Sequence, residues 1–369
     1  MKILHIGNLK SGIDTYVRNT IALACDDFTF VIVKGADDRS EPYFRKGNEV
    51  KTYEISMYRA LNPFKDFKAI RQTVKIIKNE KPDLIHCHSA KGGVIGRIAA
   101  FLTGTKVAYT AHAFSFLSAN SKIKQSIFIL FEKVTRLKSF LVACSGSELE
   151  LGVKRIKYSP KKAFVWNNAI PKINDTDVVE PAEDVKNQRF IISVGRPCYQ
   201  KNPLLMVETM RMVNKKYPDV LFYLLGVGFY SPMLDEMKQL ISKYGLENNI
   251  RLIEWLNRNE VLGYLKYAYL YLTTSLYEGL PIAVLEAMAM GKAIVSSDVI
   301  GNNDCIKDQR NGYLLPFDAK KISDAICDLL DNDEKRINMG NVSKEIFMKD
   351  FYINNRISEL ENIYKTILS

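Results

Sequence analysis

The sequence predicts an α/β protein made of two doubly wound domains, each built on a parallel sheet. Three observations support this: strand-like and helical patterns alternate along the chain, most strand-like runs are almost continuously apolar, and the alternation restarts after a polar stretch at residues 171–188. Strands that are apolar on both faces are typical of parallel sheets covered by helices on both sides. A chain of 369 residues is long enough for two such domains.

The first block of this alternation ends near residue 172. Its strand patterns lie at 2–6, 28–33, 50–55, 83–88, 106–110, 140–144 and 163–166, and helical patterns such as 67–79 and 123–137 separate many of them. Residues 171–188 are polar and acidic without apolar periodicity, and we expect them to form a linker.

The second block has strand patterns at 189–194, 220–225, 250–254, 269–274, 293–296 and 312–315. We therefore expect one domain at residues 1–172 and another at 173–351, with a terminal helix at about 352–369 that packs back on the first. Ligands of doubly wound sheets bind at the carboxyl ends of the strands, so we expect the site in a cleft where the two domains face each other.

Composition describes a soluble globular protein, with 47% hydrophobic and 25% charged residues. No window approaches 18 consecutive apolar residues, and the first residues enter a strand pattern and do not form a signal peptide. The six cysteines are scattered without a CxxC pair, which favours a reducing, cytoplasmic setting.

The positive charge is concentrated in the first half of the chain. Residues 1–172 contain 29 Lys and Arg against 14 Asp and Glu, whereas the rest of the chain is slightly acidic. A basic half of this kind should face an anionic partner. Nucleic acid would suit the charge, but no recognition module can be identified, so we expect none.

The most informative stretch is SLYEGLPIAVLEAMAMG at residues 275–291. A buried strand should precede it, with Pro281 in the first turn of the following helix and Gly291 at its end. Glu278 would lie in the turn whose backbone N–H groups can hold an anion. Glu286 is the one charge in an otherwise apolar helix, and such a carboxylate needs a partner. That partner is either structural, an arginine or backbone donors, or it is a pair of ligand hydroxyls, as on a nucleotide ribose.

Two cations share the loop after the first strand of the second block. Gly195 and Arg196 end that strand, and Lys201 precedes Asn202 and Pro203, which suit the N-cap and first turn of a helix. Two cations in a strand-to-helix loop suit a diphosphate, although solvated surface charges would also explain them.

Glycines follow strands at two further places. Gly226-Val227-Gly228 follows one strand of the second block, where it is either a ligand-contacting loop or a simple tight turn. Gly12 lies in the first strand-to-helix loop of the chain, where the lack of a side chain lets a ligand approach the backbone. The GxGxxG fingerprint of dinucleotide-binding enzymes is absent, which disfavours an oxidoreductase.

His112 follows the strand pattern at 106–110, a position that favours a ligand contact over a core histidine. His86 and His88 share one face of a strand, but the sequence shows no third ligand beside them, so we expect no zinc site. Asp-x-Asp patterns occur at residues 175–177 and 331–333, which we interpret as a chance match and capping residues.

Taken together, these motifs resemble the retaining glycosyltransferases of family 4, which have the GT-B fold. The resemblance covers essentially the whole chain and rests on GR…KN at 195–202, GxG at 226–228, the two glutamates at 278 and 286, Asp298 to Asp304 before Asn311-Gly312, and SGS at 145–147. Residues 109–116 are most similar to the branch whose acceptors are lipid-linked sugars. Three positions depart from the family pattern: Ala169, Leu256 and Ile300 stand where glycine is usual.

The resemblance implies a role for each site residue. Arg196 and Lys201 would hold the nucleotide diphosphate, Glu286 the ribose hydroxyls, and Glu278 with the following backbone the donor sugar and phosphates. From the first domain, His112 would approach the donor sugar and Gly12 would admit the diphosphate. The full donor set it implies is Gly12, Gly195, Arg196, Lys201, Gly228, Trp255, Leu256, Glu278, Gly279, Leu280, Pro281 and Glu286, with His112, Glu278, Arg196 and Lys201 assisting the chemistry.

The expected activity is transfer of a hexose or N-acetylhexosamine from a nucleotide sugar, with UDP the favoured carrier, to a polyprenyl-diphosphate-linked sugar in bacterial surface polysaccharide synthesis. Cationic side chains can stabilise the leaving diphosphate, so no metal or other cofactor is expected. Basic residues interleaved with apolar ones at 58–68 and 121–140 indicate docking on the inner face of the cytoplasmic membrane. A soluble acceptor, a phosphorylase, an epimerase and a non-catalytic nucleotide-sugar-binding protein remain alternatives.

Overall fold

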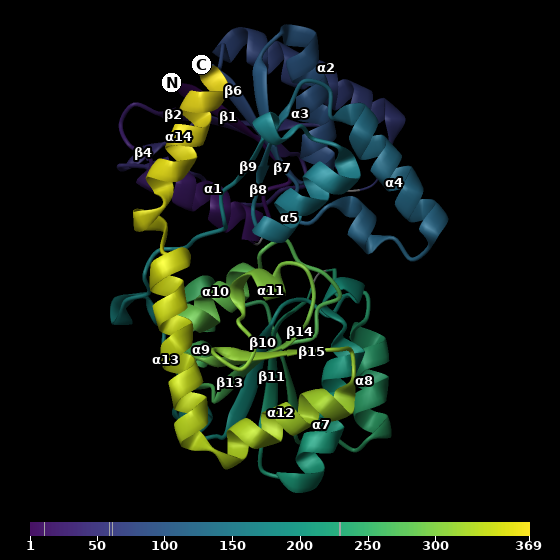
Figure 1. The fold of residues 1–369 in the computed structure, drawn as a ribbon, viewed down its shortest axis with the longest axis vertical. Coiled ribbons are helices and arrows are strands. Elements are labelled where there is room, and N and C mark those ends of the chain that lie inside the picture. Colours follow the sequence, from purple (N-terminus) through teal and green to yellow (C-terminus); the bar gives the residue numbers. More distant parts are fainter. Residues whose placement is uncertain (11, 59, 61, 229) are drawn as a thin grey trace. The chain divides into compact units, whose positions relative to one another are not determined.

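The computed structural model describes residues 1–10, 12–58, 60, 62–228 and 230–369. The chain divides into two compact units: unit 1 comprises residues 1–171 and 353–369, and unit 2 comprises residues 172–352. Figure 1 shows both units.

Unit 1 is built on a seven-stranded parallel sheet in the order β5-β2-β1-β6-β7-β8-β9. The strands are β1 (Lys2–Gly7), β2 (Thr29–Gly35), β5 (Thr52–Ile55), β6 (Leu84–His88), β7 (Lys106–Thr110), β8 (Phe140–Ala143) and β9 (Ala163–Val165). The helices are α1 (Gly12–Leu23), α2 (Pro63–Glu80), α3 (Ser89–Thr103), α4 (Lys122–Thr135), α5 (Gly146–Leu151) and α14 (Ile357–Leu368). A short antiparallel pair, β3 (Phe44–Arg45) and β4 (Asn48–Glu49), lies outside this sheet and was not predicted.

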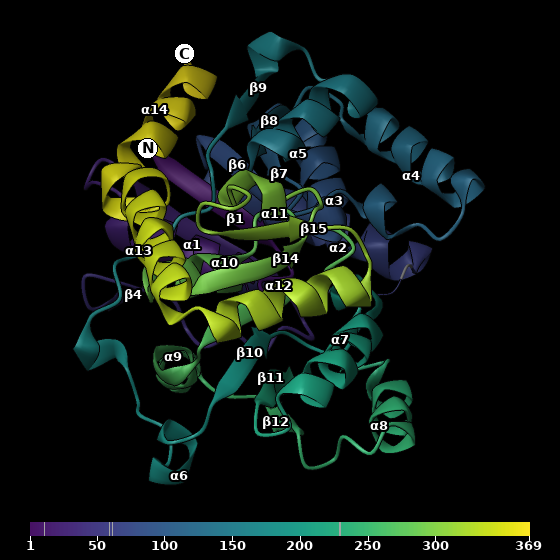
Figure 2. The same cartoon turned by 60° about the horizontal axis from the view of Figure 1, so that its bottom comes forward.

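Unit 2 repeats the design with a six-stranded parallel sheet in the order β12-β11-β10-β13-β14-β15. Its strands are β10 (Phe190–Val194), β11 (Leu221–Val227), β12 (Ile250–Glu254), β13 (Leu270–Thr273), β14 (Ala293–Ser297) and β15 (Gly312–Leu315). Its helices are α6 (Glu183–Lys186), α7 (Pro203–Lys216), α8 (Leu234–Lys243), α9 (Arg258–Tyr267), α10 (Ile282–Ala289), α11 (Asn302–Cys305), α12 (Ala319–Asp331) and α13 (Asp333–Asp350). In Figure 2, α12 and α7 lie along this sheet. Two doubly wound α/β units confirm the predicted fold class.

Local sequence explains where the helices of unit 1 begin. For example, the side chain of Asn62 accepts a hydrogen bond from the backbone N–H of Lys65, and Pro63 occupies the first position of α2. That helix ends at Lys81, which adopts a left-handed backbone conformation. The side chain of Ser121 caps α4 in the same way.

The strand order in each sheet reverses direction at one place. In unit 1 the chain moves outward on both sides from the neighbouring strands β1 and β6, and in unit 2 from β10 and β13. Such a topological switch point is where open parallel sheets bind ligands, at the carboxyl ends of the two strands. In unit 2 the loops after β10 and β13 are therefore the expected ligand site.

The C-terminal helix α14 belongs to unit 1. Its residues Leu360, Tyr364 and Ile367 are buried in a core cluster with residues of β1, β2 and α1. The indole N–H of Trp166 donates to the carbonyl oxygen of Arg356 at 2.9 Å. Figure 1 shows α14, in yellow, running beside the strands of unit 1 toward the N-terminus.

The prediction of a linker at residues 171–188 was wrong for most of that stretch, which packs on unit 2. The backbone N–H of Val179 donates to the carbonyl of Asn259 at 3.0 Å, and Lys266 donates to the Glu180 carboxylate at 2.9 Å. Gly263 makes the approach possible, because a Cβ atom there would lie 1.9 Å from the Val179 carbonyl oxygen. These tertiary contacts are not visible in the local composition.

Candidate functional site

The switch point of unit 2 gathers the predicted charged residues. Arg196 and Lys201 follow β10, and Glu278 follows β13, its neighbour in the sheet. Both loops leave the carboxyl ends of their strands, so the sheet itself brings residues about 80 positions apart in sequence to one edge.

Lys201 and Glu278 form a nearly buried ion pair. The Nζ atom of Lys201 donates to Oε1 of Glu278 at 2.7 Å, and the hydroxyl of Ser275 donates to the same oxygen at 2.7 Å. The amide nitrogen of Gln200 donates to Oε2 at 3.1 Å. Burial acts to lower the pKa of Lys201, but the Glu278 carboxylate outweighs it and the pKa is raised, so the ammonium stays charged. Sequence reasoning identified this lysine and this glutamate but missed Ser275 and Gln200.

Two glycines allow this pair to form. Gly195 has a φ of 151°, and a Cβ atom there would lie 3.0 Å from Cε of Lys201. Gly301 has a φ of 87°, and a Cβ atom there would lie 2.7 Å from Cβ of Glu278. Both positions therefore require glycine, one for the cation and one for the carboxylate. The loop before Gly301 also holds Glu278, whose backbone N–H donates to the Ile300 carbonyl at 3.0 Å.

Arg196 differs from Lys201 in having no hydrogen bond or ion pair to the residues that the structure describes, and its side chain is partly exposed. A free guanidinium at the carboxyl end of β10 is available for an anion. Asn202 is the N-cap residue of α7 and Pro203 lies in its first turn, as predicted, but the Asn202 side chain makes no capping hydrogen bond. Its backbone is left-handed, with a φ of 50°, and its carbonyl accepts from the Thr274 hydroxyl at 2.9 Å.

Glu286 also has a partner. Its Oε1 accepts from Nε of Arg258 at 2.7 Å, while Glu286 is only 6% exposed. Burial raises the pKa of the Glu286 carboxyl, and the Arg258 guanidinium offsets part of this effect. The arginine was foreseen as one of two explanations for the buried carboxylate, although not at this position. Glu286 Oε2 has no hydrogen bond within the described part of the chain.

The remaining donor residues predicted in unit 2 lie around the same edge. Gly228, with a φ of 151°, follows β11, and no atom lies within 4 Å of where its Cβ would be. Trp255 follows β12 and is exposed, and Leu256 beside it is partly buried. The backbone of Gly279, Leu280 and Pro281 is buried and leads into α10, where Pro281 is the N-cap residue and not part of the first turn. Gly291, left-handed with a φ of 69°, follows the end of this helix as predicted.

In unit 1, His112 lies in a loop of unusual backbone geometry directly after β7. His112 and Ala113 both have left-handed backbones, with φ of 51° and 79°. The N–H of Ala113 donates to Oε1 of Glu148 at 2.8 Å, and the N–H of Cys144 donates to the other carboxylate oxygen at 2.8 Å. Ser145 in turn caps α5, the helix that carries Glu148. Ser145 of the SGS motif thus helps to hold the loop of His112 through Glu148.

Gly12, predicted in the first strand-to-helix loop, is the first residue of α1. Its neighbour Ser11 lies outside the described residues, as do Arg59 and Leu61 of the basic segment 58–68.

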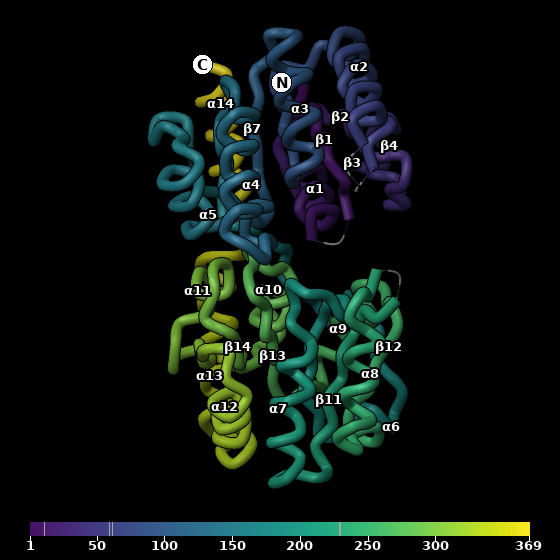
Figure 3. Tube along the Cα trace, turned by 90° about the vertical axis from the view of Figure 1, so that its right-hand side faces the viewer, coloured from purple at the N-terminus to yellow at the C-terminus, as the bar shows by residue number. Residues whose placement is uncertain are grey.

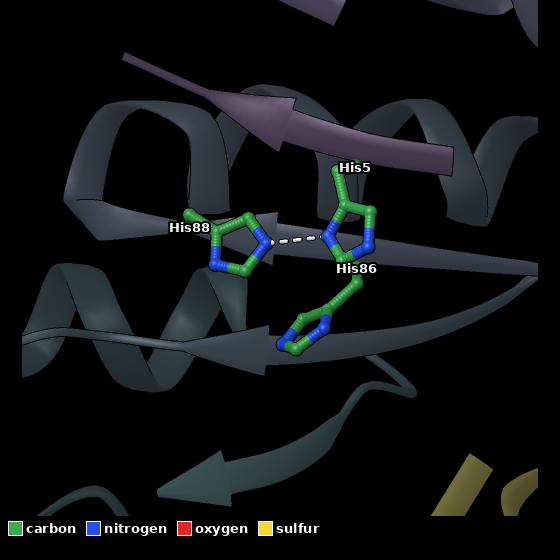
Figure 4. Close-up of side chains that lie close together, drawn as sticks. All are labelled: His5, His86 and His88. Carbon is green, nitrogen blue, oxygen red and sulfur yellow. Dashed lines mark hydrogen bonds between the residues drawn. The ribbon is translucent and has the colours of Figure 1, made fainter. Parts of the chain in front are cut away.

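The expectation that His86 and His88 lack a third histidine was wrong. His5 of β1 lies beside them, since it is the register partner of His86, and ligand atoms of the three rings lie within 4.8 Å of one another. Figure 4 shows the hydrogen bond between His5 and His88, with His86 beside them. The sequence signal was present, because His5 is the one polar residue between the first and last positions of an apolar strand.

The two Asp-x-Asp patterns are structural, as predicted for the second. Asp331 ends α12 and Asn332 caps α13, accepting from the N–H of Lys335 at 2.9 Å. Asp177 belongs to a capping box with Asn174. Among the described residues, no helix has the length and apolarity needed to cross a bilayer.

Comparison with known proteins matches both units. Residues 11–172 match the family described as Glycosyltransferase Family 4, and residues 176–346 match Glycosyl transferases group 1. The chain is 29% identical over 322 residues to an Escherichia coli protein, UDP-Gal:alpha-D-GlcNAc-diphosphoundecaprenol alpha-1,3-galactosyltransferase, covering 84% of this chain and 82% of that one. It is 21% identical to the capsular polysaccharide biosynthesis glycosyltransferase CapM of Staphylococcus aureus, covering 87% of this chain and 88% of that one.

Solved structures agree on the fold. Sucrose-phosphate synthase from Thermosynechococcus elongatus has a TM-score of 0.84 at 17% identity, covering 100% of this chain and 99% of that one. HepE of Anabaena, solved with UDP and glucose, has a TM-score of 0.80 at 16% identity, covering 99% of each chain. The two family matches follow one another along almost the whole chain, and the chain belongs to the family-4 glycosyltransferases of the GT-B fold.

Proposed function

We propose that this glycosyltransferase moves a hexose or N-acetylhexosamine from a UDP-sugar to a polyprenyl-diphosphate-linked sugar, with retention of configuration, in the synthesis of a bacterial surface polysaccharide. The observation that carries the donor assignment is the free guanidinium of Arg196 beside the Lys201–Glu278 pair at the switch point of unit 2. The name of the Escherichia coli relative supports both UDP and the lipid-linked acceptor. The name of CapM supports the role in surface polysaccharide synthesis.

Arg196 and Lys201 are proposed to hold the diphosphate. Arg196 offers five N–H donors in a planar fork that matches phosphate oxygens, and Lys201 supplies a charge held in place by Glu278. The Gly228 loop lets the diphosphate approach the backbone, and Glu286 binds the ribose hydroxyls through its second oxygen, while the base rests near Trp255 and Leu256. The backbone at Gly279, Leu280 and Pro281 contacts the donor sugar, with Gly12 and His112 contributed by unit 1.

The reaction forms a bond between the acceptor hydroxyl oxygen and the anomeric carbon as the bond from that carbon to the diphosphate oxygen breaks. The proton of the acceptor hydroxyl passes to the departing diphosphate on the same face, which retains the configuration. Two cations stabilise the growing negative charge, so we propose that transfer needs no divalent metal ion. Transfer that persists in EDTA would support this, and loss that magnesium or manganese restores would contradict it.

A lipid-linked acceptor requires a membrane surface, and α4 provides a docking face in unit 1. The apolar side chains of this helix point outward: Ile123, Ile127, Leu130, Phe131 and Val134 are between 48% and 76% exposed. Its one acidic residue, Glu132, points inward and pairs with buried Arg97 at 2.9 Å. Helices of globular proteins normally show the reverse arrangement.

The rim of this face carries Lys122, Lys124, Lys133 and Lys138, all exposed. An apolar face with a cationic rim is complementary to an anionic lipid surface, to which each lysine contributes about 1 kcal/mol. Figures 1 and 2 show α4 at the margin of unit 1, and in Figure 3 it is in the foreground. We therefore propose that unit 1 docks through α4 on the inner face of the cytoplasmic membrane, with Phe64 and Phe67 of α2, both exposed, as a second apolar contact.

The donor assignment can be tested by thermal-shift titration with a panel of UDP-, GDP-, ADP- and dTDP-sugars. A ligand that binds only the folded chain at 100 times its dissociation constant stabilises by about 2.7 kcal/mol. We expect UDP-sugars alone to raise the melting temperature of the wild type, and Arg196→Met to weaken the effect. The matched control is Arg211→Met, which removes a cation of α7 that pairs with Glu208. Stabilisation by another nucleotide in preference to UDP would contradict the proposal.

A further inference from the structure

All four histidines of the chain lie together in unit 1. His5 is on β1, His86 and His88 are on β6, and His112 follows β7, so three adjacent strands contribute. The first three are fully buried, and only His112 is partly exposed. No role in sugar transfer has been assigned to the three buried rings.

Three of the four rings form a hydrogen-bonded row that leads to His112. Nδ1 of His5 lies 2.8 Å from Nε2 of His88, and Nδ1 of His88 lies 3.1 Å from Nε2 of His112. His86 stands outside the row: its Nδ1 pairs with the Tyr364 hydroxyl at 2.7 Å and its Nε2 with the Thr110 hydroxyl at 2.8 Å. Figure 4 shows the hydrogen bond between His5 and His88, with the ring of His86 beside it.

The rings of this row are neutral near pH 7. Burial lowers the pKa of His5 to about 3, and burial lowers that of His88 well below its ordinary value. Burial also lowers the pKa of His112 to about 3. A neutral imidazole has one N–H and one bare nitrogen. His88 therefore donates to one neighbour and accepts from the other. Both hydrogen bonds of the row then run in the same donor-to-acceptor direction, either from His5 to His112 or from His112 to His5.

The far end of the row decides the direction. Nε2 of His5 is buried and has no hydrogen-bond partner within the described residues. If the row pointed from His112 toward His5, this nitrogen would carry a buried N–H without an acceptor, a costly arrangement that folded proteins rarely show. If the row points from His5 toward His112, the same nitrogen is only an unpaired acceptor.

We infer that His5 and His88 are positioning residues that fix His112 in the tautomer with its proton on Nδ1, so that it acts as a neutral hydrogen-bond donor. The kinetic consequence rests on the proposed function, in which His112 contacts the donor sugar. A neutral donor can bind a sugar hydroxyl oxygen without adding a positive charge that would attract a phosphate. The left-handed backbone at His112 and its anchoring through Ala113 and Glu148 fix the position of the same ring.

A metal ion bound by His5, His86 and His88 is the competing explanation for the cluster. It would need one bare nitrogen from each ring directed at a common point. Both nitrogens of His86 are already paired with hydroxyl groups, and His5 and His88 are paired with each other. The hydrogen bonds therefore favour the row over a metal site.

The tautomer can be observed directly in the full-length protein labelled with ¹⁵N-histidine, because four histidines give few signals. Long-range ¹H–¹⁵N correlation spectra distinguish a protonated from a bare ring nitrogen. We expect a protonated Nδ1 and a bare Nε2 in His112, with unchanged spectra on addition of Zn²⁺. A protonated Nε2 in His112, or tautomers in rapid exchange, would overturn the inference. A Zn²⁺-dependent change at His5, His86 and His88 together would overturn it in favour of a metal site.

Two matched variants extend the test. His88→Phe keeps an aromatic ring beside Tyr16 but removes the donor to Nε2 of His112. We expect it to mix the tautomers of His112 and to lower kcat about 3- to 10-fold with little change in KM for the donor. His86→Phe removes an equally buried ring outside the row, and we expect it to leave the tautomer of His112 unchanged and kcat within about twofold. If the wild type shows the expected tautomer but transfers no sugar, the proposed function is wrong and the inferred tautomer of His112 is still supported. Equal effects of the two variants on kcat would refute the positioning role.

Discussion

Lys201 and Glu278, which are 77 positions apart in sequence, form an ion pair of 2.7 Å at the carboxyl edge of the sheet in unit 2. The Glu278 carboxylate is therefore already paired before any nucleotide sugar binds. Both of its oxygens accept hydrogen bonds from within unit 2, from Lys201, Ser275 and Gln200. Its first role is to hold the lysine charged and in place, and its effect on the donor passes largely through that lysine.

Glu278→Gln should consequently weaken donor binding without any loss of contact between residue 278 and the sugar. The amide cannot compensate the Lys201 charge, and Lys201 should bind the diphosphate less well because its position is no longer fixed. We expect the dissociation constant for UDP to rise about tenfold, the equivalent of about 1.4 kcal/mol, by calorimetric titration. Glu180→Gln removes an exposed partner of Lys266 and should leave both UDP affinity and stability close to those of the wild type. Unchanged affinity in Glu278→Gln would contradict the role of the pair.

Glu286→Gln separates the two explanations for the buried carboxylate. If Glu286 binds the ribose, the variant should lose about 1.5–3 kcal/mol of UDP affinity, since a charge-assisted hydrogen bond is replaced by a neutral one. Arg258→Met removes the other half of the 2.7 Å pair and leaves the carboxylate in place. A purely structural carboxylate would make both variants less stable and leave their affinity for UDP unchanged. Urea unfolding and UDP titration of both variants measure the difference.

The buried histidines make unit 1 sensitive to acid. In the folded chain burial lowers the pKa of His5 to about 3, whereas in the unfolded chain it is about 6.5. Between these values the unfolded chain binds more protons, so stability falls as the pH falls through that window. We expect His5 alone to account for about 1–2 kcal/mol of lost stability between pH 7 and pH 5. Urea titrations should show a smaller loss over the same range in His5→Phe than in the wild type, and an equal loss would contradict the assignment.

Membrane docking through α4 predicts binding to anionic vesicles. The full-length protein should float with vesicles that contain phosphatidylglycerol, and salt should weaken the binding. The double variant Ile127→Glu/Leu130→Glu places two carboxylates on the apolar face and should bind at least about tenfold more weakly. Ile337→Glu, at an exposed apolar position of α13 in unit 2, is the matched control and should float like the wild type. If the wild type ignores anionic vesicles at low salt, a soluble acceptor becomes the better proposal.

The fold could be predicted well from the sequence because buried parallel strands are apolar along their whole length. The observed β7, β12 and β15 have the predicted bounds, and the other main strands differ by one or two residues at either end. The pair β3–β4 was missed because strands of two residues leave no periodic pattern. Residues 171–188 were misjudged because their contacts with Asn259 and Lys266 depend on the tertiary fold and not on local composition.

The candidate site, like the fold, could be predicted from the sequence only in part. Lys201, Glu278 and Glu286 could be identified because each is out of place in its local pattern, either in a loop after an apolar strand or inside an apolar helix. The partners of these residues could not be identified from the sequence, because the pairing of Lys201 with Glu278 and of Arg258 with Glu286 depends on strand order. His5 was overlooked for a different reason: it lies opposite His86 on the neighbouring strand, and spacing within one strand cannot reveal a partner on another.

The central claim is tested most directly by a transfer assay with a UDP-hexose and alpha-D-GlcNAc-diphosphoundecaprenol in vesicles, followed by NMR analysis of the product. UDP-galactose is the first donor to try, because the Escherichia coli relative is named for it. The account predicts release of UDP with appearance of the sugar in the lipid fraction, attached through an α linkage that preserves the configuration of the donor. A β-linked product would contradict retention, and failure of every UDP-hexose and UDP-N-acetylhexosamine to label the lipid, while a soluble sugar accepts the transfer, would contradict the lipid-linked acceptor.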